Sequence, residues 1–347
     1  MAYISFQPSD HFINKLYTGT GSTINVTGVG FQPDMVWLKN RDSTGGWFMY
    51  DVLRGVDYAI MSNNLDAQAD YQGLTAFDSD GYTIGTFADT NTNTEKMQSW
   101  SFKAGGAGVS NGVGDITSTV SVNATAGISL VKYLGNGSDP QTIGHGLGSV
   151  PQMMIVKKFS TDSGYAGNRG WAVYHHSMGN TQGLYLNDTD AKATKTSWWQ
   201  STTPTSTVFT IGSDGEVNDS GSNYVNWCFA PVKGYSSFGT FEGNTNVDGP
   251  FIYTGFRPAY VLIKNIDRVE AWNCWDSKMN PYNPTNNRFQ PNNTTAEVTG
   301  AGQSIDTLAN GFKVRTTSTE INDSTCVYAA FAEFPFVSSN SQSGTAR

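Results

Sequence analysis

The sequence predicts an all-β fold made of three tandem antiparallel β-sandwich modules of the jelly-roll or lectin-like kind. Two observations lead to this prediction. A segment that combines Gly, Pro, an apolar run and Lys occurs three times in the chain. Short apolar or aromatic runs also alternate with turns rich in Gly, Asn, Asp and Ser, and convincing amphipathic helices are absent. This pattern is typical of sandwiches, so each module should hold roughly six to eight short strands.

The repeated segment begins with a turn and continues as a strand. It reads GFQPDMVWLKN from Gly30, GSVPQMMIVKK around Pro151 and GFRPAYVLIKN from Gly255. In every copy a lysine stands six residues after the proline: Pro33 and Lys39, Pro151 and Lys157, Pro258 and Lys264. Gly and Pro mark a turn, and the apolar run predicts a buried strand. We expect each strand to end at its lysine, where the chain meets water.

The flanking signals keep the same order in all three copies. Each copy has Trp-x-x-aromatic followed by Asp or His, then an Asn-rich turn, then a closing strand centred on phenylalanine. The tryptophans are Trp47, Trp171 and Trp272, and the phenylalanines are Phe102, Phe229 and Phe331. We therefore expect the three modules to superpose, with the tryptophans and lysines in equivalent strands and the phenylalanines in the core.

The repeat also sets the predicted boundaries. We expect an N-terminal arm at 1–14, β-module 1 at 15–104, a Gly/Ser/Thr-rich linker at 105–128, β-module 2 at 129–236, β-module 3 at 237–336 and a disordered tail at 337–347. The linker contains ITSTVSVN, which could add a strand. Met61–Tyr71 is the best helical candidate in the first module, and a turn is an equal alternative because of Asn63 and Asn64.

The charge balance bears on possible partners. The formal net charge is −8, the isoelectric point is near 4.9, and charged residues make up only 14% of the chain. Nucleic-acid binding needs clustered Lys and Arg, so neither a nucleic acid nor an anionic membrane surface is expected as a partner. No apolar run approaches the roughly 20 residues of a bilayer span, and MAYISFQPSD does not read as a signal peptide. We expect no membrane insertion, and synthesis in a cytoplasm.

The sequence offers no pattern of an enzyme, a cofactor site or a metal site. Cys228, Cys274 and Cys326 stand far apart and are expected to be buried apolar residues. His175 takes the place that aspartates hold in the other copies, which favours a structural role. Asp78-Ser-Asp80-Gly81 resembles the opening of a calcium loop without its later ligands, and a turn is the simpler interpretation. We expect no catalysis, although paired carboxylates for sugar hydrolysis depend on spatial separation.

Aromatic residues that occur in one copy only are the candidate binding or interface residues. Trp198 and Trp199 lie in the polar stretch TKTSWWQSTT, and Tyr282 lies in NPYNPTNN. Adjacent residues of a strand point to opposite faces, so one interpretation exposes at least one tryptophan, where it could stack on a sugar or form a subunit contact. Burial of both tryptophans within their own module is the alternative.

Several long segments resemble a family of virion proteins of marine tailed bacteriophages. They include YISFQPSDHF, GFQPDMVWLKN, GPFIYTGFRPAYVLIKN and YAAFAEFPF, and the resemblance covers nearly the whole chain. It implies a structural protein of the virion, such as a tail fibre or a receptor-binding surface appendage that takes part in host attachment. The implied partners are other phage virion proteins and a host surface glycan or protein, and the implied assembly is a homotrimer. The alternatives are a polysaccharide-degrading tailspike and a carbohydrate-binding module.

Overall fold

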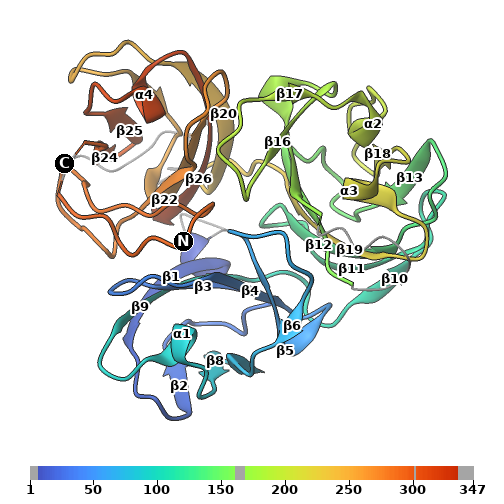
Figure 1. The fold of residues 1–347 in the computed structure, drawn as a ribbon, viewed down its shortest axis with the longest axis horizontal. Helices are drawn as coiled ribbons and strands as arrows, with labels where there is room; N and C mark the ends of the chain where they lie inside the picture. The colour runs from blue at the N-terminus through green and yellow to red at the C-terminus, as the bar shows by residue number, and fades with distance from the viewer. Residues whose placement is uncertain (1–6, 161–168, 301, 335–347) are drawn as a thin grey trace, which may run out of the picture.

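The fold is described by a computed structural model that covers residues 7–160, 169–300 and 302–334. It consists mainly of short β-strands in six sheets, and all pairings between its named strands are antiparallel. Figure 1 shows three units arranged around a common centre. The all-β prediction is therefore confirmed. No helix in the described ranges is long and apolar enough to cross a membrane.

Unit 1 contains the elements up to β9. Its strands are β1 (Phe12–Thr18), β2 (Ile24–Thr27), β3 (Met35–Asn40), β4 (Trp47–Asp51), β5 (Gly55–Met61), β6 (Ala69–Asp70), β7 (Leu74–Asp78), β8 (Gly81–Ile84) and β9 (Lys96–Phe102). A 3-10 turn, η1 (Pro8–Asp10), precedes β1, and a single helical turn, α1 (Ala88–Asn91), precedes β9. The large sheet has the order β1-β9-β3-β4-β5-β6 and the small sheet β2-β8-β7.

Unit 2 begins inside the predicted linker. Its strands are β10 (Val109–Asn111), β11 (Ser118–Asn123), β12 (Ile128–Leu134), β13 (Gln141–Gly144), β14 (Met153–Lys158), β15 (Trp171–His175), β16 (Gln182–Tyr185), β17 (Ala193–Thr194), β18 (Val208–Ile211) and β19 (Asn223–Phe229). Its helical turns are η2 (His176–Met178), α2 (Thr196–Trp199) and α3 (Gly215–Asn218). The large sheet has the order β10-β11-β12-β19-β14-β15-β16-β17, and β13 pairs with β18.

Unit 3 has the fewest described strands of the three units. Its strands are β20 (Ser236–Glu242), β21 (Phe251–Tyr253), β22 (Arg257–Asn265), β23 (Asn273–Asp276), β24 (Ile305–Leu308), β25 (Gly311–Val314) and β26 (Thr325–Phe334), with one helical turn, α4 (Thr319–Asn322). The large sheet has the order β20-β26-β22-β23 and the small sheet β21-β25-β24.

The same strand order occurs in each unit. The large sheets share β1-β9-β3-β4, β12-β19-β14-β15 and β20-β26-β22-β23, in which the closing strand lies between the first strand and the lysine strand. Lys39, Lys157 and Lys264 occupy equivalent strands, as predicted. Trp47 and Trp171 begin β4 and β15, whereas Trp272 directly precedes β23. The repeated sequence therefore produces a repeated topology.

The central strands of each large sheet are buried on both faces. In β3, Val36 and Leu38 contact the private core between the two sheets of unit 1, and Met35 and Trp37 contact a core shared by all three units. This double burial explains why all residues of β3 are buried. In Figure 1 the small sheets lie on the outside of the ring and the large sheets toward its centre.

The three closing phenylalanines meet in the shared core. The ring centroids of Phe102, Phe229 and Phe331 are 5.2 to 5.9 Å apart, and each residue is 5% exposed. This confirms that they are core residues. The three buried cysteines also agree with the prediction.

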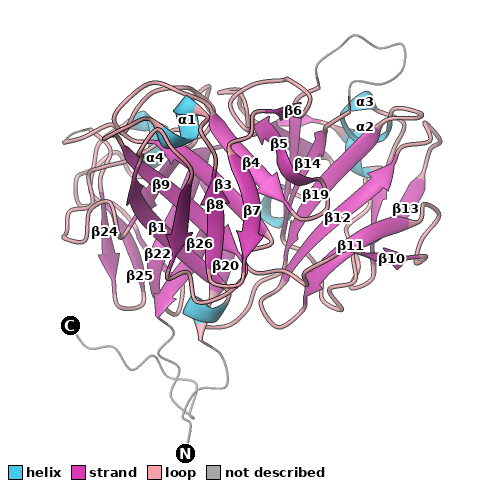
Figure 2. Cartoon of the chain, turned by 90° about the horizontal axis from the view of Figure 1, so that it is seen from below, coloured by secondary structure: helices cyan, strands magenta, loops and turns pink. Residues whose placement is uncertain are grey.

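In every unit, a buried asparagine forms a hydrogen bond with the turn that follows the first strand. The helical turns α1, α3 and α4 lie at the same end of the molecule in Figure 2 and end at Asn91, Asn218 and Asn322. Each asparagine Oδ1 accepts a hydrogen bond from the backbone of the glycine turn that follows the first strand; the donors are the amides of Thr20, Asn136 and Asn244 at 2.8 to 3.0 Å. The repeated pattern in the sequence did not predict this bond.

Three predicted features differ from the structure. The segment 105–128 is not a free linker, because β10 and β11 extend the large sheet of unit 2; the strand expected at ITSTVSVN is β11. Met61–Tyr71 forms the end of β5, a turn and β6, so the helical alternative is wrong. β1 begins within the predicted arm, at Phe12. The tail predicted at 337–347 lies outside the described residues.

Candidate functional site

The repeated lysines are buried at the joints between units, which corrects the expectation that they meet water. Lys39, Lys157 and Lys264 are at most 1% exposed. Their Nζ atoms donate to backbone carbonyls of the neighbouring unit: Lys39 to Thr294 at 3.3 Å, Lys157 to Leu65 at 2.7 Å and Lys264 to Thr189 at 3.1 Å. Burial lowers the pKa of Lys157 to about 7 and that of Lys39 and Lys264 to about 8. These hydrogen bonds compensate for lost hydration.

The repeated tryptophans form the second part of each joint. Trp171 Nε1 donates to the carbonyl of Asn64 at 3.0 Å, and Trp47 Nε1 donates to the carbonyl of Asn293 at 3.1 Å. In the third joint, Trp272 Nε1 donates to the carbonyl of Tyr185 at 2.9 Å. Units 1 and 2, 2 and 3, and 3 and 1 are therefore joined head to tail by equivalent elements. The three units form a closed ring with approximate threefold symmetry.

In units 2 and 3, the His or Asp that ends the tryptophan strand bonds to a neighbouring unit. Asp276 accepts hydrogen bonds from Asn14 Nδ2 and Trp100 Nε1 of unit 1, both at 2.7 Å. Burial raises the pKa of Asp276 to about 6. His175 Nδ1 accepts from an adjacent backbone amide, and Nε2 lies 3.2 Å from the carbonyl of Tyr328 in unit 3. Burial lowers the pKa of His175 to about 3, so its neutral ring bridges two units.

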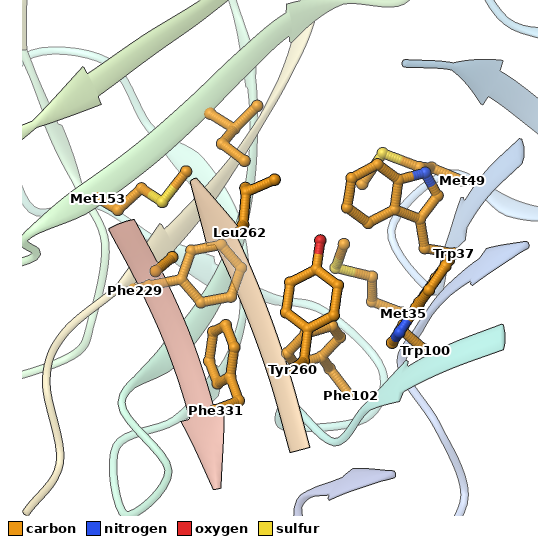
Figure 3. A pocket seen from close by; sticks show the side chains of 12 residues that line it. Met35, Trp37, Met49, Trp100, Phe102, Met153, Phe229, Tyr260, Leu262 and Phe331 are labelled. Carbon is orange, nitrogen blue, oxygen red and sulfur yellow. The ribbon is translucent and has the colours of Figure 1, made fainter. Parts of the chain in front are cut away.

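A small apolar cavity of about 30 Å³ lies on the ring axis. Figure 3 shows it between the phenylalanine triad and side chains from the lysine strands of all three units. Ala329 stands where the closing strands of units 1 and 2 carry Trp100 and Trp227. The missing third indole leaves this part of the wall without a large side chain. The cavity is too enclosed and apolar to act as a site for polar chemistry.

The two adjacent tryptophans do not form an exposed surface. Trp198 and Trp199 lie on the helical turn α2 rather than on a strand, and both are at most 1% exposed. Their rings are 6.1 Å apart and nearly perpendicular, and Trp199 packs against Tyr174 at 5.7 Å. Burial of both within their own module is therefore confirmed and the exposed interpretation is wrong, because alternation applies to strands and not to a helical turn.

Exposed aromatic side chains gather instead on the outer sheet of unit 3. Phe251 and Tyr253 of β21 are 45% and 64% exposed, whereas Ile252 between them is buried. The two aromatic rings therefore stand on the outward face of the small sheet. Tyr253 pairs with Gly311 of β25, and a Cβ at Gly311 would lie 3.2 Å from a ring carbon of Phe251. The same Cβ would clash with the backbone carbonyl of Ile252, so the glycine allows β21 and β25 to approach closely.

Charged residues surround this aromatic pair. Lys313, which pairs with Phe251, lies 2.6 Å from Asp248, and Arg315 lies 3.4 Å from Asp248 and 3.3 Å from Asp306. The hydrogen bond from Lys313 is the main cause of the lowered pKa of Asp248. Two cations and two anions therefore neutralise one another beside the aromatic pair.

Tyr282 lies in a loop beside the same sheet. It is 79% exposed. The next residue, Asn283, donates from Nδ2 to the carbonyl of Thr307 in β24 and accepts from the Thr307 amide, both at 2.9 Å. Exposed aromatics thus occur at both edges of the sheet β21-β25-β24. Of the three predicted site residues, Tyr282 alone belongs to this candidate surface.

The sequence interpretation missed Phe251 and Tyr253. Their equivalents are Asn25 and Thr27 in unit 1, and Thr142 and Gly144 in unit 2, as the strand registers show. An alternating aromatic pair in only one copy of the repeat would have identified them, by the same criterion that selected Tyr282. The other units carry polar or small residues on this face, so the aromatic surface is specific to unit 3.

A second open surface lies on unit 2. It is a groove of about 430 Å³ beside the edge strand β10. Valine, glycine and uncharged polar residues line it: Val109, Ser110, Asn111, Val113, Val120, Val122, Gly146, Gly148, Ser206 and Thr207. None of these residues has a titratable side chain, so the groove provides no group for acid–base catalysis.

The acidic turn proposed as a possible calcium loop has another role. Asp80 accepts hydrogen bonds from the amides of Gly28 and Gly30 at 3.0 and 2.6 Å, and these bonds lower its pKa. Both carboxylate oxygens therefore hold the neighbouring turn, which is the simpler of the two interpretations. In the described parts of the chain, no group of three or more His, Cys, Asp and Glu side chains is placed to hold a metal ion.

Comparison with known proteins identifies the family of the chain. No curated protein and no solved structure matches this chain. The sequence model of a family described as a domain of unknown function (DUF7483) matches residues 7–335. That range begins just before η1 and includes all three units. The chain therefore belongs to the DUF7483 family.

Proposed function

We propose that this chain is a non-catalytic structural protein of a bacteriophage virion, located in a tail fibre or another surface appendage. Its three units are three tandem β-sandwich modules, each with a private core between two sheets. The observation that carries the proposal is that the residues that join the units differ from the residues that remain exposed. The repeated Lys and Trp residues, together with His175 and Asp276, join the modules, and an aromatic face on module 3 stays exposed. Such an arrangement suits a rigid scaffold that presents a binding face.

The burial of the shifted titratable groups also supports a binding role. Lys157, His175 and Asp276 have displaced pKa values of the kind that active sites use. Each is buried at a joint and bonded to a backbone or side-chain partner there. Their pKa values shift because closure of the ring buries these groups. The placement in a virion rests on the resemblance to phage structural proteins described above.

The location can be tested on purified phage particles. Mass spectrometry should find the chain in the particle, and electron microscopy should show it at a tail or surface appendage. Purified protein should compete with the phage for adsorption to host cells. Replacing Phe251 and Tyr253 by serine should abolish the competition, and the matched change of Asn25 and Thr27 to alanine in module 1 should preserve it. Absence from the particle, or reducing sugar released by the purified protein from host envelope glycan, would refute the proposal.

The homotrimer remains a separate prediction. Trp198 and Trp199 cannot form its subunit contact, because both are buried. The single chain already supplies three equivalent modules around one axis, so closure of the ring needs no second copy. Light scattering at micromolar concentration measures the outcome directly: a mass of three chains supports the prediction and a mass of one chain rejects it.

A further inference from the structure

We infer that the outer face of the sheet β21-β25-β24 is a carbohydrate-binding surface that takes neutral hexopyranose units. This inference deepens the proposed function and rests on it for the biological source of the glycan. The binding itself depends only on the residues of module 3.

The register places two rows of side chains across the outward face. One row runs from Phe251 through Lys313 to Asp306, and the other starts at Tyr253 and passes through Gly311. Neighbouring strands are about 4.8 Å apart, so each row spans roughly 10 Å. This length matches two linked sugar rings. The aromatic rings lie on the edge strand β21, and in the first row Lys313 and Asp306 follow Phe251 on the next two strands.

Exposed aromatic rings at this position need a partner that is apolar on one side and polar on its rim. Isolated exposed apolar residues are common on proteins, but Phe251 and Tyr253 are adjacent on one face, and modules 1 and 2 have no aromatic there. A pyranose presents an apolar face of C–H groups and a rim of hydroxyls. The face can stack on an aromatic ring while the rim stays hydrogen-bonded.

The ion pairs beside the aromatic rings can form hydrogen bonds with the hydroxyl groups of a neutral sugar. A hydroxyl group both donates and accepts a hydrogen bond. Lys313 and Arg315 provide donors within 3.4 Å of the acceptors Asp248 and Asp306, so neighbouring hydroxyls can bond to both kinds of group. A uronate or sulfate would repel one of the carboxylates, and its binding would require one of these pairs to break. The balance of charge therefore favours a neutral glycan over an acidic one.

The test uses purified full-length protein and defined oligosaccharides. Linear hexasaccharides of glucose, galactose and mannose are titrated by calorimetry and by NMR, together with a hexasaccharide that contains glucuronate. We expect at least one neutral hexasaccharide to bind, and to bind at least tenfold more tightly than the acidic one. The double variant Phe251→Ala and Tyr253→Ala should lose at least tenfold in affinity. The matched variant Asn25→Ala and Thr27→Ala should bind as the unmodified protein does.

The folding of each variant is checked by near-ultraviolet circular dichroism, and Lys313→Met offers a change outside the aromatic pair that should also weaken binding. Failure of all neutral hexasaccharides to bind, or equal binding by the aromatic double variant, would overturn the inference. Host-cell binding that survives periodate oxidation but not protease treatment would identify a protein partner and would also overturn it. Sugar binding by the purified protein does not depend on where the chain resides. Its failure is thus distinguishable from failure to find the chain in the particle.

Discussion

Replacement of Phe229 by alanine should destabilise the whole ring rather than module 2 alone. The Phe229 ring lies 5.9 Å from Phe102 and 5.7 Å from Phe331, which belong to the other two modules. Loss of the buried ring costs about 1.5–3 kcal/mol of transfer free energy. The truncation also leaves roughly 100 Å³ of void, which costs about 2 kcal/mol more at ~24 cal/mol per Å³. The expected loss in unfolding free energy is therefore about 4 kcal/mol.

The matched control is Phe209→Ala, because Phe209 is equally buried but lies in the private core of module 2. Both variants should lose similar stability in urea denaturation. Hydrogen exchange should separate them: Phe229→Ala should reduce protection in β3 and β22 of the neighbouring modules, and Phe209→Ala should act within module 2. Three independent unfolding transitions, or unchanged exchange in β3 and β22 after Phe229→Ala, would refute the shared core.

Three further changes test the joints and the cavity. Lys157→Met removes hydrogen bonds to the carbonyls of Leu65 and Arg169 and should cost about 1–3 kcal/mol at pH 7 in urea denaturation. Because the pKa of Lys157 falls from 10.5 to about 7 on folding, the unfolded chain binds more protons between these values, and the unmodified protein should gain stability relative to this variant as pH rises from 7 to 10. The pKa of Asp276 rises from 3.8 to about 6, so its stabilising contribution is present below pH 3.8 and is lost as pH rises through 6. Relative to Asp276→Asn, the unmodified protein should lose about 3 kcal/mol over that window, and parallel pH profiles would contradict this. Ala329→Val should fill part of the axial cavity and raise the unfolding free energy by about 0.5–1.5 kcal/mol, whereas a decrease would show that the wall cannot accept the added methyl groups.

The repeat allowed the fold to be predicted at the level of elements. Three identical proline-to-lysine spacings placed Lys39, Lys157 and Lys264 in equivalent strands, and the closing strands placed the three phenylalanines in a core. These predictions succeeded because a period-two pattern and a fixed spacing are local properties of a sequence. The free cysteines were assigned to the interior for the same kind of reason.

The closure of the ring could not be predicted in the same way. A lysine at the end of an apolar strand reads as a boundary with water, and nothing local indicates that Leu65 of another module supplies a carbonyl to Lys157. Trp198 and Trp199 were misassigned because the interpretation took a helical turn for a strand. Tyr282 remained useful because its exposure follows from a Pro- and Asn-rich loop. Phe251 and Tyr253 were within reach of sequence reasoning, had the copies been compared position by position.

Ring closure also explains why the three copies differ where they do. The face of each large sheet that carries the repeated tryptophan is covered by the other modules, so a module standing alone would expose Trp47 or its equivalents to water. Residues at the joints must fit a neighbour and keep their spacing, whereas the outer small sheets have no such partner. Polar Asn25 in module 1 and aromatic Phe251 in module 3 are therefore compatible with one scaffold. Because the outer faces can vary without breaking the ring, binding specificity can change on one module while the other two preserve the structure.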